Sequence, residues 1–247
     1  MVKKLIVGNW KMNPQSASVA KDISEKIFRG AKKFRNITVV IVPPAPFISS
    51  LKGVLGAQDF FYEKEGAYTG MMSAEMLKSL GVKYVIVGHS ERRHAGDTDE
   101  IVNKKLKRAL DVFLIPILCV GEETRDHHSQ YLHFVRGQIV YALKNVSKNL
   151  VGKIVIAYEP VWAIGKNAKG VLDGEEALHM NIFIRKVVAD IAGEKTAKKI
   201  KVLYGGSVDG KNSTQFMSLG KMDGLLVGRE SLVPKNFLKI IEHGSRS

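Results

Sequence analysis

Eight short runs of apolar residues recur along the 247-residue chain, and segments with helical spacing separate them. Most runs are continuously apolar rather than alternating, which is typical of parallel strands covered by helices on both faces. The predicted strands are residues 4–8, 38–42, 55–60, 84–88, 114–120, 154–158, 201–204 and 224–227. This alternation predicts an α/β fold, a single (β/α)8 barrel with parallel strands over residues 1–247; the main alternative is an open doubly wound sheet.

Within this pattern the third strand is the weakest, because Gln58 and Asp59 interrupt its apolar run. Between the strands, apolar residues at helical spacing predict the buried face of each helix. One such stripe is Val19, Ala20, Ile23, Ile27 and Ala31, and another is Leu178, Ile182 and Val188. Ser16 is placed to cap the first helix, Gly81 to end an early one, and Pro234 to begin the last.

Composition narrows the class of protein. A single cysteine, Cys119, excludes an intramolecular disulfide and favours a reducing compartment. The apolar run at residues 5–7 is too short for a signal-peptide core, and no apolar segment is long enough to span a membrane. We therefore expect a cytoplasmic protein without a membrane partner.

The formal net charge of +14 raises the question of nucleic-acid binding. The basic residues are spread over separate segments, including residues 26–33, 104–108 and 195–199, each in a predicted amphipathic helix or at its end. A solvated helix surface explains such residues, so nucleic acid is an unlikely main partner, although a secondary contact stays open. A positive average field is also expected to attract small anionic substrates.

Polar side chains follow several of the predicted strands. Asn9 and Lys11 follow the first strand, His89 the fourth, and Glu159 the sixth. Burying an ionised carboxylate at the end of an apolar strand costs free energy, so its presence there indicates a functional role. The carboxyl ends of barrel strands lie on one rim, which is where barrel enzymes place their active sites.

Glycine turns follow the seventh and eighth strands at residues 205–206 and 228. Barrel enzymes often bind phosphate at this position with backbone N–H groups. The sequence contains neither the Gly-Lys-Ser/Thr signature of a nucleotide-binding loop nor the His and Cys spacing of a metal site, so we expect no cofactor and no metal.

Four motifs at these strand ends resemble those of the triosephosphate isomerase family. They are residues 9–13 (NWKMN), 88–93 (GHSERR), 158–165 (YEPVWAIG) and 204–208 (YGGSV), and they occur in the family's order. The resemblance covers essentially the whole chain. It implies a TIM barrel that interconverts dihydroxyacetone phosphate and D-glyceraldehyde 3-phosphate through an enediolate, in glycolysis and gluconeogenesis, without a cofactor.

The resemblance also implies roles for particular residues. Glu159 is expected to be the base, His89 the neutral electrophile, and Lys11 and Asn9 the groups that bind substrate and stabilise the enediolate. The expected phosphate ligands are the backbone N–H groups of Gly165, Ser207, Gly228 and Arg229. Residues 160–170 are expected to form a lid, and the loop around Thr69 to join two subunits in a homodimer.

Other residues near these motifs have structural interpretations. Glu91 is expected to brace Lys11 or His89, and Cys119 to pack behind the site. Trp10 and Trp162 are expected to be packing and hinge residues. Two rival functions stay open: a phosphate-binding barrel enzyme for another sugar phosphate, and a basic binding protein built on an inactive barrel.

The chain departs from the family at three places. Arg229 replaces a glycine, and we expect its side chain to point away so that the phosphate site survives. The lid sequence 165–170 is altered towards its C-terminal hinge, which predicts slower or less complete closure. Met71 replaces an acidic residue in the intersubunit loop, which exchanges an ion pair for an apolar contact.

Overall fold

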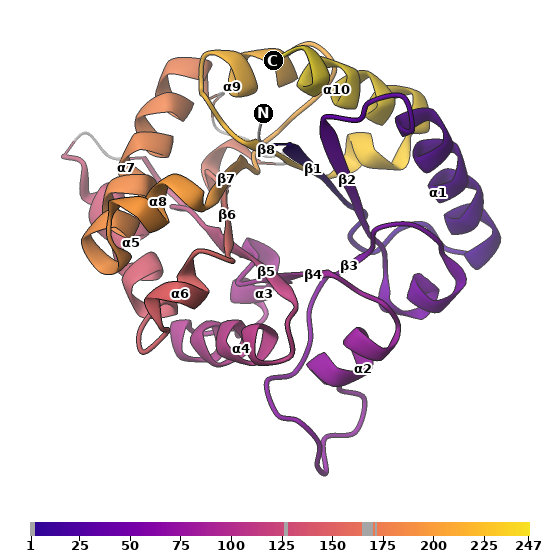
Figure 1. The fold of residues 1–247 in the computed structure, drawn as a ribbon, viewed down its shortest axis with the longest axis horizontal. Helices are drawn as coiled ribbons and strands as arrows, with labels where there is room; N and C mark the ends of the chain where they lie inside the picture. Colours follow the sequence, from indigo (N-terminus) through magenta and orange to yellow (C-terminus); the bar gives the residue numbers. More distant parts are fainter. Residues whose placement is uncertain (1–2, 126–127, 165–169, 171) are drawn as a thin grey trace.

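The computed structural model describes residues 3–125, 128–164, 170 and 172–247. Its eight strands are parallel and lie in the order β2-β1-β8-β7-β6-β5-β4-β3, with helices around them (Figure 1). One parallel bridge between Ile41 and Leu55 joins β2 to the segment that leads into β3, and the Ile41 N–H donates to the Val54 carbonyl at 3.1 Å. The predicted parallel (β/α)8 barrel is therefore confirmed.

Observed strand bounds follow the apolar runs closely. The strands are β1 Lys4–Asn9, β2 Ile37–Val42, β3 Gly56–Ala57, β4 Tyr84–Val87, β5 Ile115–Val120, β6 Val155–Tyr158, β7 Lys201–Tyr204 and β8 Gly224–Val227. The largest difference is β3, which contains two residues instead of the six predicted. Its ladder ends where Gln58 begins, and the Gln58 amide donates to the carbonyls of Lys11 and Val42 instead.

Helices cover the outside of the strands. The α-helices are α1 Ala17–Ala31, α2 Ala74–Ser79, α3 Ser90–His94, α4 Asp99–Asp111, α5 Gln130–Ala142, α6 Lys148–Val151, α7 Gly174–Ala192, α8 Glu194–Lys199, α9 Ser213–Ser218 and α10 Pro234–Arg246. Short 3-10 helices are η1 Ala45–Ser50, η2 Val161–Ala163 and η3 Arg229–Leu232.

The predicted helix ends are confirmed. The Ser16 hydroxyl accepts the Val19 N–H at the start of α1, and Pro234 is the first residue of α10. Gly81 follows α2 with a φ of +77°, a backbone angle that favours glycine.

In two of the predicted apolar stripes, one residue expected to be buried is exposed. Val19 is 47% exposed and Ile182 is 58% exposed, so neither packs under its helix. The buried face of α7 instead contains Ala177, Met180, Ile184 and Val188, with the amide of Asn181 among them. That amide donates to the Gly220 and Lys221 carbonyls, so a polar residue at helical spacing has taken the place expected for an apolar one.

The core has two layers. Inside the barrel, small and branched side chains from alternate strand positions pack together, among them Val7, Val40, Ile117 and Leu203. The larger layer lies between the strands and the helices. No helix among the described residues is both long and apolar enough to cross a membrane.

Candidate active site

Glu159 follows β6 directly and is 2% exposed. Its Oε2 accepts the backbone N–H of Ser90 at 3.2 Å, and its Oε1 lies 3.3 Å from Nε2 of His89. Its own N–H donates to the Val120 carbonyl at 2.8 Å. The buried carboxylate therefore has a hydrogen-bond donor in the Ser90 N–H and a close neighbour in His89, and both residues lie at the start of α3.

Two glycines make room for Glu159. A Cβ at Gly121 would lie 1.8 Å from the Glu159 carbonyl oxygen, and a Cβ at Gly205 would lie 2.9 Å from its Cγ. The strand ends of β5 and β7 approach β6 this closely only because neither neighbour carries a side chain. Gly205, predicted as part of a phosphate-binding turn, thus also determines where the carboxylate can lie.

His89 caps α3 and is buried. Its Nδ1 accepts the Glu91 N–H at 3.1 Å, so Nδ1 carries no proton and the imidazole is neutral. The remaining proton is on Nε2, the nitrogen that faces Glu159. One backbone N–H thus determines the tautomer of His89.

Lys11 has a φ of +51°, a backbone conformation that is uncommon for a residue with a side chain. The Asn9 Oδ1 accepts the Lys11 N–H at 3.1 Å, and the Gln58 amide donates to the Lys11 carbonyl at 2.8 Å. At the other end of the side chain, Nζ lies 2.5 Å from Oε1 of Glu91. Glu91 thus braces Lys11, as expected. Gln58, which the sequence marked only as an interruption, holds its backbone.

The turn after β7 is organised by a pair of mutual caps. The Asp209 Oδ1 accepts the N–H groups of Lys211 and Asn212, while the Asn212 Oδ1 accepts the Asp209 N–H. The Asn212 amide also donates to the Ser207 carbonyl at 3.0 Å. Among the described residues, the N–H groups of Ser207 and Gly228 donate to no protein acceptor. Both are therefore available to a ligand.

Arg229 is exposed and begins η3. It is not among the described residues with a positive φ, and Gly228 before it has a φ of −84°. No glycine-only backbone angle is therefore needed, and the strain that an arginine could have caused here is absent. Beneath this turn, the buried Trp10 indole donates to the Ser231 carbonyl at 3.2 Å, which confirms that Trp10 is a packing residue.

Glu122 is a buried carboxylate that the sequence analysis did not single out. Its Oε1 accepts from the Tyr158 hydroxyl at 2.8 Å, from Nε1 of Trp162 at 2.9 Å and from Arg125 at 3.4 Å. Burial and the adjacent Glu122 charge raise the pKa of Tyr158 well above its usual value. Glu122 therefore ties the segment after β6 to the end of β5. A carboxylate two residues after the end of an apolar strand was the available signal.

The main cavity lies over the carboxyl ends of β1, β7 and β8 and has a volume of about 410 Å³. Its lining includes Asn9, Lys11, His89, Glu159, Ser207, Gly228 and Arg229. Seven of the eight predicted site residues therefore meet in one cavity. The eighth, Gly165, lies outside the described residues, as does most of the predicted lid.

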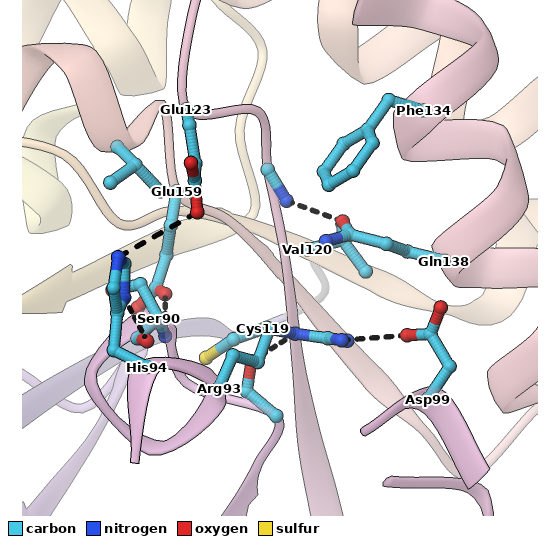
Figure 2. Close-up of a pocket in the computed structure, with 13 residues that line it drawn as sticks. Ser90, Arg93, His94, Asp99, Cys119, Val120, Glu123, Phe134, Gln138 and Glu159 are labelled. Atoms are coloured by element: carbon cyan, nitrogen blue, oxygen red, sulfur yellow. Dashed lines mark hydrogen bonds and ion pairs between the residues drawn. The ribbon is translucent and has the colours of Figure 1, made fainter. Parts of the chain in front are cut away.

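A second cavity of about 320 Å³ lies behind Glu159, between α3 and α5 (Figure 2). Phe134 and Gln138 line its far side, and Arg93 crosses its floor to pair with Asp99 at 2.6 Å. Cys119 borders this cavity, and burial together with the neighbouring Glu159 raises the pKa of its thiol well above the usual value. Cys119 is thus an unionised packing residue behind the site, as expected.

Comparison with known proteins gives one family. A family model described as triosephosphate isomerase matches residues 4–244. Proteins named triosephosphate isomerase from Dictyoglomus thermophilum and Caldanaerobacter subterraneus subsp. tengcongensis are each 42% identical to this chain, over 98% of it and the whole of each relative. One of that name from Francisella philomiragia subsp. philomiragia is 38% identical, over 99% of this chain and 98% of the relative.

Proposed function

The chain belongs to the triosephosphate isomerase family and interconverts dihydroxyacetone phosphate and D-glyceraldehyde 3-phosphate, and on this premise we propose how its own residues perform the reaction. We treat residues 1–247 as one catalytic domain. The observation that supports the proposal best is the pairing of a buried Glu159 with a neutral His89 at the rim of the main cavity.

Glu159 is the base in this proposal. One carboxylate oxygen can take a proton from one carbon of the triose and return it to the next. In the unliganded site its Oε1 faces the Nε2–H of His89. A substrate carbonyl that accepts this Nε2–H takes the donor away from Glu159 and leaves Oε1 free to accept the proton. Substrate binding thus redirects the His89 donor from the base to the carbonyl oxygen.

Lys11 and Asn9 complete the polar rim. The ammonium of Lys11 supplies positive charge next to the enediolate, where a preorganised charge lowers the barrier most. Because Asn9, Gln58 and Glu91 hold Lys11 at both its backbone and its Nζ, little reorganisation is needed in the transition state. The substrate phosphate binds the N–H groups of Ser207, Gly228, Arg229 and Gly165.

Isomerisation of D-glyceraldehyde 3-phosphate by Glu159→Gln tests the assignment of the base. We expect kcat to fall by about 10³-fold, because loss of general base catalysis typically costs 10²–10⁴-fold. The matched control is Glu123→Gln, an exposed glutamate on the second cavity, which should keep the parental rate. Near-parental turnover by Glu159→Gln, or an equal loss in both variants, would place the base elsewhere.

Phosphate inhibition of an Arg229→Gly variant tests the proposed phosphate site. Its exposed side chain has no ion pair among the described residues, and we propose that it leaves the backbone N–H groups accessible to phosphate. Arg229→Gly should therefore change the inhibition constant of inorganic phosphate by less than about threefold, a difference below 1 kcal/mol. A much tighter phosphate affinity in the variant would show that the arginine obstructs the site.

Residues 165–170, in the proposed lid, depart from the family pattern. We expect slow or incomplete closure, with Trp162 held to Glu122 in the unliganded state. Stopped-flow fluorescence of Trp162 on binding a substrate analogue measures the closure rate. Closure that is much faster than turnover would contradict this expectation.

A homodimer is the proposed assembly. The segment between β3 and α2 extends beyond the ring of helices (Figure 1), and at its tip Tyr68 and Met71 are exposed. Met12, after β1, is 84% exposed. Exposed apolar side chains of this kind favour an interface. Light scattering should give a dimer, and Met71→Asp should shift it towards monomer; a fully active monomer of the parent chain would contradict the proposal.

A cytoplasmic location stays the expectation from the single cysteine.

A further inference from the structure

The end of the barrel opposite the active site concentrates positive charge. Because all eight strands are parallel, every segment that leads into a strand lies at this end, which we call the amino-end face. The segments are residues 3–4, 32–36, 51–55, 80–83, 112–114, 143–154, 193–201 and 219–223. Together they contain fifteen lysines and arginines but only two carboxylates, Glu194 and Asp223.

The segments that follow the strands have the opposite balance. They are residues 10–16, 43–44, 58–73, 88–98, 121–129, 159–173, 205–212 and 228–233. Their described residues contain seven lysines and arginines and eleven carboxylates. Nearly all of the net charge of +14 therefore lies on the amino-end face rather than being spread evenly over the surface.

Most of these cations face water without a partner. Lys83, Lys153 and Lys199 are exposed, and none of them has an ion pair or a side-chain hydrogen bond with another described residue. Of the two carboxylates, Asp223 lies 2.5 Å from Arg185 and is already paired. Burial lowers the pKa of Lys4, and repulsion from Lys221 and Lys201 acts in the same direction although Asp223 opposes it. Lys4, Lys201 and Lys221 therefore lie close enough for their charges to interact.

An exposed aromatic ring also lies on this face. Phe113 is 75% exposed and has a φ of +61°, which turns the chain between α4 and β5. The lysines on either side precede the neighbouring strands: the Lys83 carbonyl accepts the Ile115 N–H at 2.8 Å, and β5 pairs with β6, which Lys153 precedes. An exposed ring between lysines is the arrangement on which nucleic-acid bases stack while their phosphates meet the cations.

We propose that the amino-end face binds single-stranded nucleic acid through its phosphate backbone, with Phe113 as a stacking site for one base. Lysine acts on phosphate as a point charge without base preference, so the binding is independent of sequence. A membrane surface would require adjoining apolar side chains for insertion. The large exposed apolar side chains described on this face are only three, Leu80, Phe113 and Leu219, against fifteen lysines and arginines.

The topology removes the sequence-based argument against such a partner. Basic residues that are far apart in the sequence were expected to be dispersed over the surface, but the barrel brings each segment that precedes a strand to the same end. The face lies opposite the main cavity, which is at the carboxyl ends of the strands. Bound nucleic acid therefore leaves the isomerase site open.

Fluorescence anisotropy with a labelled single-stranded oligouridylate tests the proposal. The test variant is Lys83→Glu/Lys153→Glu/Lys199→Glu, and the matched control is Lys21→Glu/Lys235→Glu/Lys239→Glu, which makes the same change of net charge with exposed lysines of α1 and α10. We expect the test variant to bind at least about tenfold more weakly and to have a salt slope smaller by about 2, because three phosphate contacts are lost. The control should stay within about threefold of the parent chain.

Further arms distinguish the partner. Phe113→Ala should weaken binding of the oligonucleotide but not of inorganic polyphosphate, which has no bases to stack. Isomerase activity should be unchanged when the oligonucleotide is bound, and it reports that each variant is folded. Three results would overturn the proposal: no binding of the parent chain at low salt, an equal loss in the test and control variants, or binding to anionic phospholipid vesicles but not to the oligonucleotide.

Discussion

At the carboxyl end of β6, Glu159 is almost completely buried and contacts the Ser90 N–H and His89, whereas at the amino end of the same strand Lys153 projects into water without a partner among the described residues. The contrast extends around the barrel. Buried polar groups with assigned partners gather after the strands, and solvated lysines gather before them. The buried groups are sensitive to single changes because each has few alternatives to its partner, while the solvated ones exchange protein contacts for water at little cost.

The largest expected effect compares the same substitution at the two ends. Lys11→Met should lower kcat/KM by about 10²–10³-fold, the usual cost of one preorganised group in the transition state. Lys153→Met, at the amino end, should leave steady-state kinetics with D-glyceraldehyde 3-phosphate unchanged. An equal loss of kcat/KM in the two variants would contradict a catalytic difference between the two ends.

Glycine-to-alanine substitutions at Gly121 and Gly152 compare how tightly the two ends are packed. Gly121→Ala puts a Cβ 1.8 Å from the Glu159 carbonyl oxygen and should lower the free energy of unfolding by about 3 kcal/mol. Gly152, before β6, has a φ of −64° and its nearest atoms would lie 3.8 Å from an added Cβ. Gly152→Ala should therefore change stability by less than about 0.5 kcal/mol in urea denaturation. Similar losses in the two variants would contradict the difference in packing.

Two glutamates make the third comparison. Glu122→Gln removes the charged acceptor shared by Tyr158 and Trp162 and should cost about 2 kcal/mol of stability. Glu194, on the amino-end face, is 85% exposed and lies 3.8 Å from Lys198, so Glu194→Gln should have no measurable effect. The measurement is urea denaturation of both variants. If Glu122→Gln left the free energy of unfolding unchanged, water would have to replace the lost partners of this carboxylate.

The smallest expected effect concerns Lys201 at the start of β7. Burial lowers its pKa below 10.5, so between the two values the unfolded chain binds more protons than the folded chain. Stability of the parent chain therefore rises with pH through this window. Lys201→Met has no such proton, and its stability relative to the parent should fall as pH increases from neutral to 10.5. Lys201→Arg, which stays charged throughout, supplies the control; a pH-independent difference for Lys201→Met would contradict the lowered pKa.

The sequence predicted the barrel because its signals are local. Continuous apolar runs, Ser16 as a cap and Gly81 as a stop each depend on neighbouring residues alone, and the structure confirms them. β3 was overestimated because its register depends on the Gln58 amide, which bonds to β2 and the loop after β1. Ile182 was misplaced because the buried Asn181 finds acceptors in a turn about forty residues away. No local pattern contains that information.

For the site, the sequence predicted the motif residues but not the residues that hold them in place. Asn9, Lys11, His89 and Glu159 follow strands and match a family, so motif and topology agree on them. Gln58 and Glu122 act by holding other residues, and such roles appear only when the partners are in place. The distribution of charge was likewise invisible in the sequence, because it depends on which segments share an end of the barrel.

This distribution has a consequence for how the substrate arrives. Electrostatic influence decays over about 8 Å at physiological ionic strength, which is shorter than the length of a barrel strand. The excess lysines therefore cannot guide a triose phosphate to the opposite mouth, despite the net charge of +14. The enzyme acts as an electric dipole along the barrel axis, and capture of the anionic substrate depends on the few cations at the mouth itself, Lys11 and Arg229.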